Sequence, residues 1–433
     1  MSSDWPRVSL RDFADLLAGF AFKSSGYTEN SQDVRLLRGD NIAPGRVRWD
    51  GVKRWPKNCG VDLAKYALEP GDVVLAMDRP WIPAGLKVAQ TTEIDTPSYL
   101  VQRVARLRAG SGADCDFLFS LLSAPEFESY IQNATTGTAV PHISAKQILD
   151  YEFRLPPASV RVEVGALLAA INNRITLLRE TNATLEAIAQ ALFKSWFVDF
   201  DPVHAQMQGR SPEGMDEATA ALFPDSFEES ELGAVPKGWK VESLDSIASF
   251  LNGLALQKYP PTGANDLPVI KIAQLRKGDT TGADLASRSI KPEYVIQNGD
   301  VLFSWSGSLE VEIWCGGEGA LNQHLFKVTS GAFPKWFYFL WTRQHLEHFR
   351  KVAASKATTM GHIQRAHLSS ATVFVPSDEV LRAADSVLEP IMQRLIENSL
   401  QASNLAELRD TVLPRLISGQ LRITETRTEM ESV

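Results

Sequence analysis

Basic and aromatic side chains alternate at three places early in the chain: Arg46-x-Arg48-Trp49, Lys53-Arg54-Trp55 and Arg79-Pro80-Trp81. The planar guanidinium of arginine can hold a guanine edge or a phosphate through two parallel hydrogen bonds. These runs therefore predict a surface that contacts nucleic acid. The sequence leaves a second interpretation open, in which the loops are solvated and the tryptophans are buried.

Further basic candidates stand in the second half of the chain, at Lys271, Arg276, Lys277, Lys356 and Arg365. Two matched loops, Thr135–His142 and Thr358–His362, are candidates for reading bases or positioning phosphates. Their side chains of interest are Thr138, His142 and His362. The alternative for both histidines is that they cap the helices that follow.

Residues with the spacing of a catalytic site are missing from the sequence. An adenine methyltransferase would need an Asp/Asn-Pro-Pro-aromatic tetrad, and the nearest string, Asp201-Pro202-Val203-His204, lacks the second proline and the aromatic residue. No GxxxxGK(S/T) phosphate-binding loop occurs, and His345-x-x-His348 has no third ligand at metal-site spacing. We therefore predict a non-catalytic chain without a cofactor or metal site. The alternatives are a self-sufficient methyltransferase or nuclease, and a purely structural scaffold.

The elements that must position these residues form a direct repeat. Trp5, Leu10 and Gly19 match Trp239, Leu244 and Gly253 at a constant offset of 234. Later matches keep their order while the offset falls to 220: residues 70–75 with 298–303, Leu100-x-Gln102-x-Val104 with Leu321-x-Gln323-x-Leu325, and His142-Ile143 with His362-Ile363. Such drift is typical of a duplicated domain with loop insertions. Short β-branched runs between turn residues predict mixed α/β structure in each copy, which we call the first and second heads.

A long helical pattern follows each head. Apolar residues recur at spacings of three and four from Leu168 to Trp196 and from Leu388 to Leu416. Each such row of apolar residues is the seam along which one helix packs on another. The two seams predict helices over 159–197 and 378–417 that pair as a coiled coil. Asn182 interrupts the first seam, so it either lies on a solvated face or sits in the seam and fixes the helix register.

Two head-plus-helix units in one chain resemble a fused dimer, and a two-fold arrangement makes the helices antiparallel. The predicted fold class is α+β, with two duplicated mixed α/β domains, each followed by a long helix, and an antiparallel coiled coil with pseudo-two-fold symmetry. The expected boundaries are 1–157 for the first head, 158–200 for the first helix, 201–237 for a linker, 238–376 for the second head, 377–423 for the second helix and 424–433 for a disordered tail.

The net charge of −8 is unevenly distributed, with −1 over residues 1–157, −7 over 158–236 and +4 over 237–376. This positive charge is small for a protein that binds nucleic acid by itself, so partner subunits are expected to neutralise part of the phosphate charge. The three cysteines are isolated from one another, and no apolar run is long enough to span a membrane. We expect a cytoplasmic protein with no membrane partner.

Several strings resemble conserved parts of the specificity subunits of type I restriction–modification systems. Leu192-Phe-Lys-Ser-Trp-Phe-Val-Asp-Phe-Asp-Pro-Val203 is similar to the central conserved region of that family, and residues 413–423 are similar to its C-terminal region. Residues 233–239 resemble the usual start of the second target-recognition domain, and the end of each head resembles the end of such a domain. The resemblance covers essentially the whole chain.

This resemblance implies sequence-specific reading of double-stranded DNA. Each head would be a target-recognition domain that reads one half of a bipartite, asymmetric site. The helices would carry two methylation subunits, and restriction subunits would add ATP-driven translocation and cleavage. S-adenosylmethionine, ATP and Mg²⁺ are then expected in the partner subunits and not in this chain.

Trp196, Phe197 and Phe200 gather at the end of the first predicted helix. Aromatic side chains are frequent anchors of protein interfaces, so the cluster is a candidate docking surface for a methylation subunit. The alternative is core packing beneath a head. The sequence leaves both interpretations open.

Overall fold

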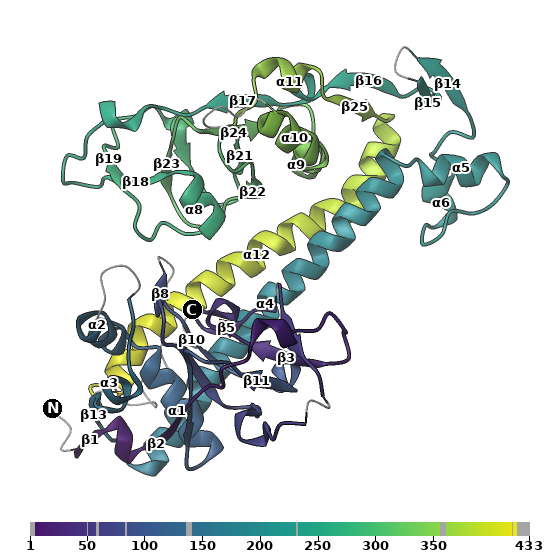
Figure 1. The fold of residues 1–433 in the computed structure, drawn as a ribbon. Coiled ribbons are helices and arrows are strands. Elements are labelled where there is room, and N and C mark those ends of the chain that lie inside the picture. The colour runs from purple at the N-terminus through teal and green to yellow at the C-terminus, as the bar shows by residue number, and fades with distance from the viewer. Residues whose placement is uncertain are drawn as a thin grey trace. The chain divides into compact units, whose positions relative to one another are not determined.

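The computed structural model describes residues 5–49, 51–57, 60–82, 85–135, 141–230, 233–355, 361–417 and 419–421. The chain divides into two compact units (Figure 1). One comprises residues 1–176 and 404–433, and the other comprises residues 177–403. The expected tail, 424–433, lies outside the described residues.

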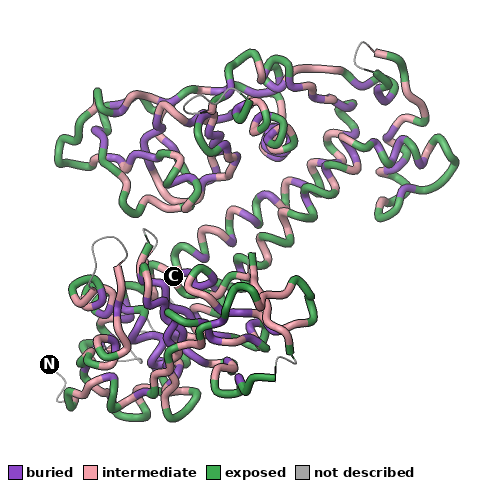
Figure 2. Tube along the Cα trace, in the orientation of Figure 1, coloured by how far each residue is buried: buried purple, intermediate pink, exposed green. Residues whose placement is uncertain are grey.

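The first head is built on an antiparallel sheet of four strands in the order β10-β7-β12-β2. Its strands are β10 (Val88–Gln90), β7 (Val73–Ala76), β12 (Val104–Ala109) and β2 (Ala14–Ala18). All four residues of β7 are fully buried, and helix α1 (Gly112–Leu122) packs on the sheet (Figure 2). A central strand covered on both faces explains the unbroken run Val73-Val74-Leu75-Ala76 in the sequence.

Smaller elements complete the first head. A second sheet has the order β11-β3-β6, in which β11 and β3 are parallel. The remaining bounds are β1 (Arg7–Ser9), β3 (Val34–Leu37), β4 (Ile42–Ala43), β5 (Arg46–Val47), β6 (Lys53–Trp55), β8 (Trp81–Ile82), β9 (Gly85–Leu86), β11 (Ser98–Leu100), β13 (Glu152–Arg154), α2 (Pro125–Ala134) and α3 (Ala145–Leu149).

The second head has a four-stranded antiparallel sheet in the order β22-β21-β24-β17. Its strands are β22 (Val311–Ile313), β21 (Val301–Ser304), β24 (Leu325–Thr329) and β17 (Ser249–Asn252). A further sheet pairs β18 with β23 in parallel. The other bounds are β16 (Lys240–Ser243), β18 (Leu267–Ile270), β19 (Leu285–Ala286), β20 (Val295–Ile296), β23 (Gly319–Leu321), β25 (Thr372–Val375), α7 (Leu244–Ile247), α8 (Ile272–Lys277), α9 (Lys335–Gln344), α10 (Leu346–Ser355) and α11 (Arg365–Ser369).

One matched glycine in each head permits a close approach of two backbone segments. A Cβ atom on Gly19 would lie 2.2 Å from the carbonyl oxygen of Val101, and one on Gly253 would lie 2.2 Å from that of Asn322. Both distances are too short for any other residue, so the repeat preserves glycine here for steric reasons. The amide of Gly19 also donates to the Val104 carbonyl at 3.0 Å.

The two long helices are observed as α4 (Ala158–Phe197) and α12 (Asp378–Ile417), each of 40 residues. Within the first unit, the Arg409 guanidinium donates to Asn172 Oδ1 at 3.0 Å. Within the second unit, the Asn182 amide donates to the Leu395 carbonyl and to Ser399 Oγ, both at 2.9 Å. Asn398 donates in return to Asn182 Oδ1 at 2.9 Å. Asn182 therefore sits in a helix–helix contact and not on a solvated face.

Residues 201–237, which the sequence predicts as a linker, contain folded elements. They form α5 (Asp201–Met207), α6 (Glu217–Ala220) and the hairpin β14 (Phe227–Ser230) with β15 (Gly233–Pro236). Val203, Phe223 and Val235 are buried in the same apolar cluster as Trp239. This segment is consequently part of the core of the second unit.

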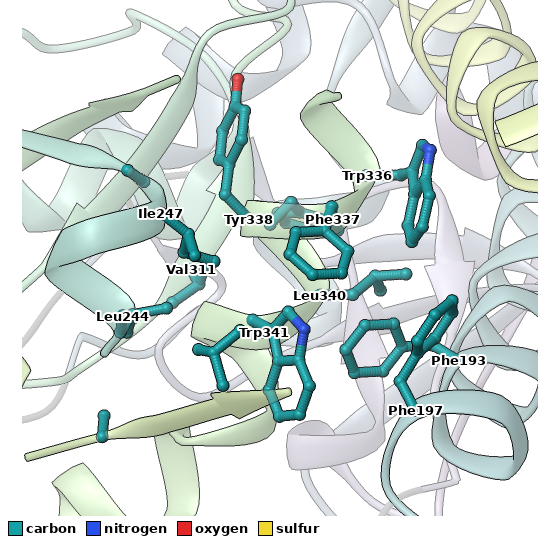
Figure 3. Close-up of a cluster of buried hydrophobic side chains, with 14 of the residues drawn as sticks. Phe193, Phe197, Leu244, Ile247, Val311, Trp336, Phe337, Tyr338, Leu340 and Trp341 are labelled. Atoms are coloured by element: carbon teal, nitrogen blue, oxygen red, sulfur yellow. The ribbon is translucent and has the colours of Figure 1, made fainter. Parts of the chain in front are cut away.

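The aromatic residues at the end of α4 also belong to this core. Trp196, Phe197 and Phe200 are 7%, 0% and 9% exposed, and Phe197 packs against rings of α9 (Figure 3). Phe200 contacts Trp239 edge to face, with ring centroids 5.7 Å apart. Side chains buried to this extent offer no surface to a partner, so the docking interpretation is wrong and the packing alternative holds.

The hydrogen bonds of Asn182 yield a test of stability. We expect Asn182→Ala to lower the free energy of unfolding by roughly 1–3 kcal/mol, because Asn398 loses its acceptor inside the helix contact. Asn173→Ala is the matched control, since Asn173 is exposed on the same helix and should change stability by under about 0.5 kcal/mol. Urea unfolding measures both. Equal, small changes would contradict a role for Asn182 in the seam.

Candidate nucleic-acid interface

Three polar side chains of the first head meet where strand β7 ends; we call them the first strand-end cluster. Asp78 accepts a hydrogen bond from the Arg103 guanidinium and another, at 2.6 Å, from His142 Nδ1. Arg103 stands in the turn between β11 and β12. His142 forms an isolated antiparallel bridge with Asp78. Three separate chain segments thus contribute to one cluster.

The electrostatics of this cluster hold Asp78 in its charged form. Burial raises the pKa of the Asp78 carboxyl, but hydrogen bonds from Arg103 and His142 outweigh that effect and place the pKa below its ordinary value. The side chain of Asp78 is 22% exposed, whereas that of Arg103 is 67% exposed. A carboxylate that fixes one edge of a guanidinium leaves the other donors free to bind a base or a phosphate.

The second head has polar residues at the corresponding place, the second strand-end cluster: Ser306, His324 and His362. Ser306 follows β21, and its Oγ lies 2.9 Å from His324 Nδ1. His362 forms an isolated antiparallel bridge with Ser306, as His142 does with Asp78. The His362 ring is exposed, and its centroid lies 6.3 Å from that of Trp305.

The two clusters share one backbone arrangement. In the first head, the Met77 amide donates to the Arg103 carbonyl at 2.8 Å, and the Ile143 amide donates to the Met77 carbonyl at 2.9 Å. In the second head, the Trp305 amide donates to the His324 carbonyl at 3.3 Å, and the Ile363 amide donates to the Trp305 carbonyl at 3.0 Å. We call this set of backbone hydrogen bonds the frame. The same frame therefore carries Asp, Arg and His side chains in the first head and Ser, His and His side chains in the second.

Among the predicted residues of the first head, some stay accessible. Arg46, Arg48 and Arg79 are exposed, and in the described part of the chain no side-chain partner is seen for them. His142 is in the first strand-end cluster, and Thr138 lies outside the described residues. The structure thus keeps three of the predicted arginines available for a ligand.

The basic–aromatic alternation around Trp49 and Trp55 is partly explained by packing. Trp49 Nε1 donates to Asp95 Oδ1 at 2.9 Å, and the Arg35 guanidinium lies 4.3 Å from its ring centroid. On the separate strand β6, Lys53 pairs with Glu29 at 3.6 Å. Its neighbour Arg54 donates to the Asp33 carbonyl at 2.9 Å. Lys53 and Arg54 are therefore engaged within the head, unlike Arg46 and Arg48.

Most predicted cations of the second head have internal partners. Lys271 pairs with Asp284, and Lys277 pairs with Asp279 at 3.3 Å. Arg365 donates to the Phe250 carbonyl at 3.1 Å. Arg276 is exposed on α8, and Lys356 lies outside the described residues. In the described part of the second head, Lys271, Lys277 and Arg365 are thus engaged within the head.

The alternative role of the two histidines, helix capping, is wrong. Ser144 is the N-cap of α3 and accepts from the Gln147 amide, whereas His142 binds Asp78. Gln364 is the N-cap of α11. Both histidines lie before the cap positions, and each forms a backbone bridge with a residue of the strand-end cluster of its own head.

Sequence reasoning missed Asp78, Arg103, Ser306 and His324. A signal was present, because Arg103 and His324 are the variable positions inside the matched strings Leu100-x-Gln102-x-Val104 and Leu321-x-Gln323-x-Leu325. A variable side chain on a preserved frame is what a reader of two different ligands requires. Among the described residues, no three His, Cys, Asp or Glu side chains come together as a metal site would need, and no helix is long and apolar enough to cross a membrane.

Comparisons with known proteins agree on one family, although no family model matches the chain. The type I restriction enzyme MjaIX specificity subunit of Methanocaldococcus jannaschii is 23% identical over 324 residues, which cover 72% of this chain and 71% of that protein. The HindI specificity subunit of Haemophilus influenzae is 23% identical over 410 residues, covering 83% and 88%. The crystal structure of the type I system S subunit from M. genitalium has the same fold, with a TM-score of 0.53, 15% identity and coverage of 95% and 96%. The resemblance found in the sequence is confirmed.

The lowered pKa of Asp78 predicts a pH-dependent stability. A carboxyl whose pKa is lowered in the folded chain stabilises the fold at pH values above its ordinary pKa of 3.8. This stabilisation is lost as the pH falls through the lower pKa of the folded state. We expect Asp78→Asn to be less stable than the native chain by roughly 1–3 kcal/mol at pH 7, with the gap closing in acid. Asp40→Asn is the control, because Asp40 is 81% exposed in its ion pair with Arg38. A gap that persisted unchanged at low pH would contradict the charged interaction.

Proposed function

Starting from its homology to the specificity subunits of type I restriction enzymes, we propose that this chain is the DNA-reading subunit of such an enzyme. Each head reads one half of a bipartite, asymmetric site in double-stranded DNA. The observation that carries the proposal is the pair of strand-end clusters, in which one backbone frame presents different donors and acceptors. Sequence is read by side chains that contact base edges, so different side chains select different half-sites.

The proposed architecture is that of two duplicated target-recognition domains, 1–157 and 238–376, each followed by a long helix. The regions 158–200 and 377–423 hold the helices, and 201–237 joins the first helix to the second head. We propose that the helices form an antiparallel coiled coil with pseudo-two-fold symmetry. Support comes from the contacts within each unit, where Asn172 meets Arg409 and Asn182 meets Asn398.

The chain is proposed to act without a catalytic site of its own. Two methylation subunits bind it, and restriction subunits join the assembly to translocate and cut DNA. S-adenosylmethionine, ATP and Mg²⁺ belong to those partners. The relatives are named as specificity subunits of restriction enzymes, which supports this division of labour.

Exchange of one head tests the proposed reading of half-sites. Replacing residues 1–157 by the first head of another specificity subunit should change only one half of the methylated DNA motif, because each head carries its own strand-end cluster. Replacing residues 238–376 is the matched control and should change only the other half. Sequencing of methylated host DNA measures both motifs. A change in both halves after a single exchange would contradict independent reading.

Engineered cysteines and a short bifunctional maleimide test the direction of the helices. Asn172→Cys with Arg409→Cys should cross-link, since the two native side chains are in hydrogen-bonding contact at 3.0 Å and the reagent spans the gap that shortening the arginine leaves. Asn172→Cys with Met392→Cys is the control, because Met392 is the repeat mate of Asn172 and would lie beside it in a parallel pair. Mass spectrometry of the digested chain identifies the bond. A cross-link in the control pair alone would overturn the antiparallel arrangement.

A further inference from the structure

Lys87 is a nearly buried cation in the first head, with 8% of its surface exposed. Its backbone is fixed between β9 and β10, where its amide donates to the Pro80 carbonyl at 2.6 Å and its carbonyl accepts from Ala76 at 3.0 Å. Among the described residues, no acceptor lies within hydrogen-bonding distance of its Nζ. Burial lowers the pKa of the Lys87 ammonium. Most of the side chain is buried while Nζ keeps some contact with solvent, so the ammonium is placed to bind an anion from outside the chain.

The charges around Lys87 do not supply that anion. Asp40 and Asp78 attract the ammonium, but Asp40 already binds Arg38 at 3.1 Å and Asp78 binds Arg103 and His142. Arg48 and Arg79 repel the ammonium, and neither has a side-chain partner in the described part of the chain. The two carboxylates are thus outnumbered by five cations, which are Arg38, Arg48, Arg79, Lys87 and Arg103.

Arg79 occupies a backbone position that favours glycine. Its φ angle is 44°, and its amide donates to the Pro141 carbonyl at 2.7 Å. The corresponding residue of the second head is Gly307, with a φ of 67° and an amide that donates to the Gly361 carbonyl at 2.9 Å. A side chain kept in a left-handed conformation, where glycine would be unstrained, is characteristic of a functional position.

The second head neutralises the position that corresponds to Lys87. The Lys87 carbonyl accepts from Ala76 at the end of β7, and the Glu310 carbonyl accepts from Ser304 at the end of β21. Glu310 is therefore the counterpart of Lys87. Its carboxylate accepts from Arg350 at 3.0 Å, so this pair is complete within the chain. The need for an external anion is confined to the first of these two positions.

We propose that Lys87, with Arg48 and Arg79, binds a phosphodiester group of the DNA backbone in the first head. The inference rests on the proposed function and adds that the two heads contact the DNA backbone differently. The first head binds a phosphate at a position where the second head has an ion pair within the chain. A phosphodiester supplies the oxygen acceptors that these cations lack. A free phosphate ion has the same chemistry, and the experiment below separates the two sources.

Two variants of the full chain, assembled with its methylation subunits, test this site. Binding of a random-sequence duplex is measured over a range of salt concentrations, since phosphate contacts dominate such binding. Lys87→Met should lower the slope of log K against log salt by about 0.9 for the lost contact. Lys65→Met, at an exposed position of the same head, is the matched control and should leave the slope unchanged.

Thermal unfolding without DNA shows that the variants are intact. Lys87→Met should melt at or above the native temperature, because methionine keeps the apolar stem packed and removes a partly desolvated charge that has no partner in the described part of the chain. A structural lysine would instead lower it. Arg79→Gly gives a second route should Lys87→Met fail to fold: it relieves the left-handed backbone, so it should raise the melting temperature and still reduce the salt slope.

The remaining outcomes separate the two proposals. Native slope and affinity in both variants would overturn the phosphodiester site while leaving the proposed function intact. Stabilisation of the native chain by inorganic phosphate at constant ionic strength, lost in Lys87→Met with the DNA slope unchanged, would identify a free phosphate as the ligand and also overturn it. A native complex that binds no duplex even at low salt would contradict the proposed function itself.

Discussion

The close approach of Gly19 to the turn before β12 is the constraint on which the candidate interface depends. A Cβ at Gly19 would lie 2.2 Å from the Val101 carbonyl oxygen, so the turn can lie there only against glycine. The Gly19 amide then binds the Val104 carbonyl, and the Arg103 carbonyl accepts from Met77 at the end of β7. Backbone contacts alone therefore bring residue 103 beside residue 78. Gly253 sets the same geometry for His324 and Ser306.

A frame held by backbone atoms leaves its side chains free to differ. In the first head, the frame carries a carboxylate–guanidinium pair; in the second, it carries a hydroxyl–imidazole pair. A guanidinium can bind a guanine edge through two donors, whereas a hydroxyl or an imidazole offers single donors and acceptors. Replacing these side chains leaves the backbone hydrogen bonds in place. This separation of frame from side chains explains how the repeat could diverge in sequence and keep its fold.

Local patterns revealed the helices and the repeat, because periodicity and matched glycines are properties of short segments. The seam around Asn182 was ambiguous, since the face of a helix on which a residue lies depends on the partner helix. The strand-end clusters were not found, because Asp78 and His142 are 64 positions apart and meet only through the sheet. Lys87 gave no signal either. Its neighbours Leu86 and Val88 mark a strand, and only the folded head shows that most of the Lys87 side chain is buried.

The pairing of charged side chains, more than the number of each charge in a segment, decides where this acidic chain can bind an anion. The first head has a net charge of −1, yet ion pairs engage many of its acids, such as Asp72 with Arg108 and Asp15 with Arg106. Arg48, Arg79 and Lys87 are left without partners among the described residues.

The second head has a net charge of +4 over residues 237–376, but Lys271, Arg288 and Arg350 are each matched by an acid. A phosphate responds to the potential within a Debye length, about 8–10 Å at moderate salt, and not to the sum over a domain. The head with the lower net charge thus contains the stronger local site for an anion. Segment charges counted from the sequence rank the two heads in the opposite order.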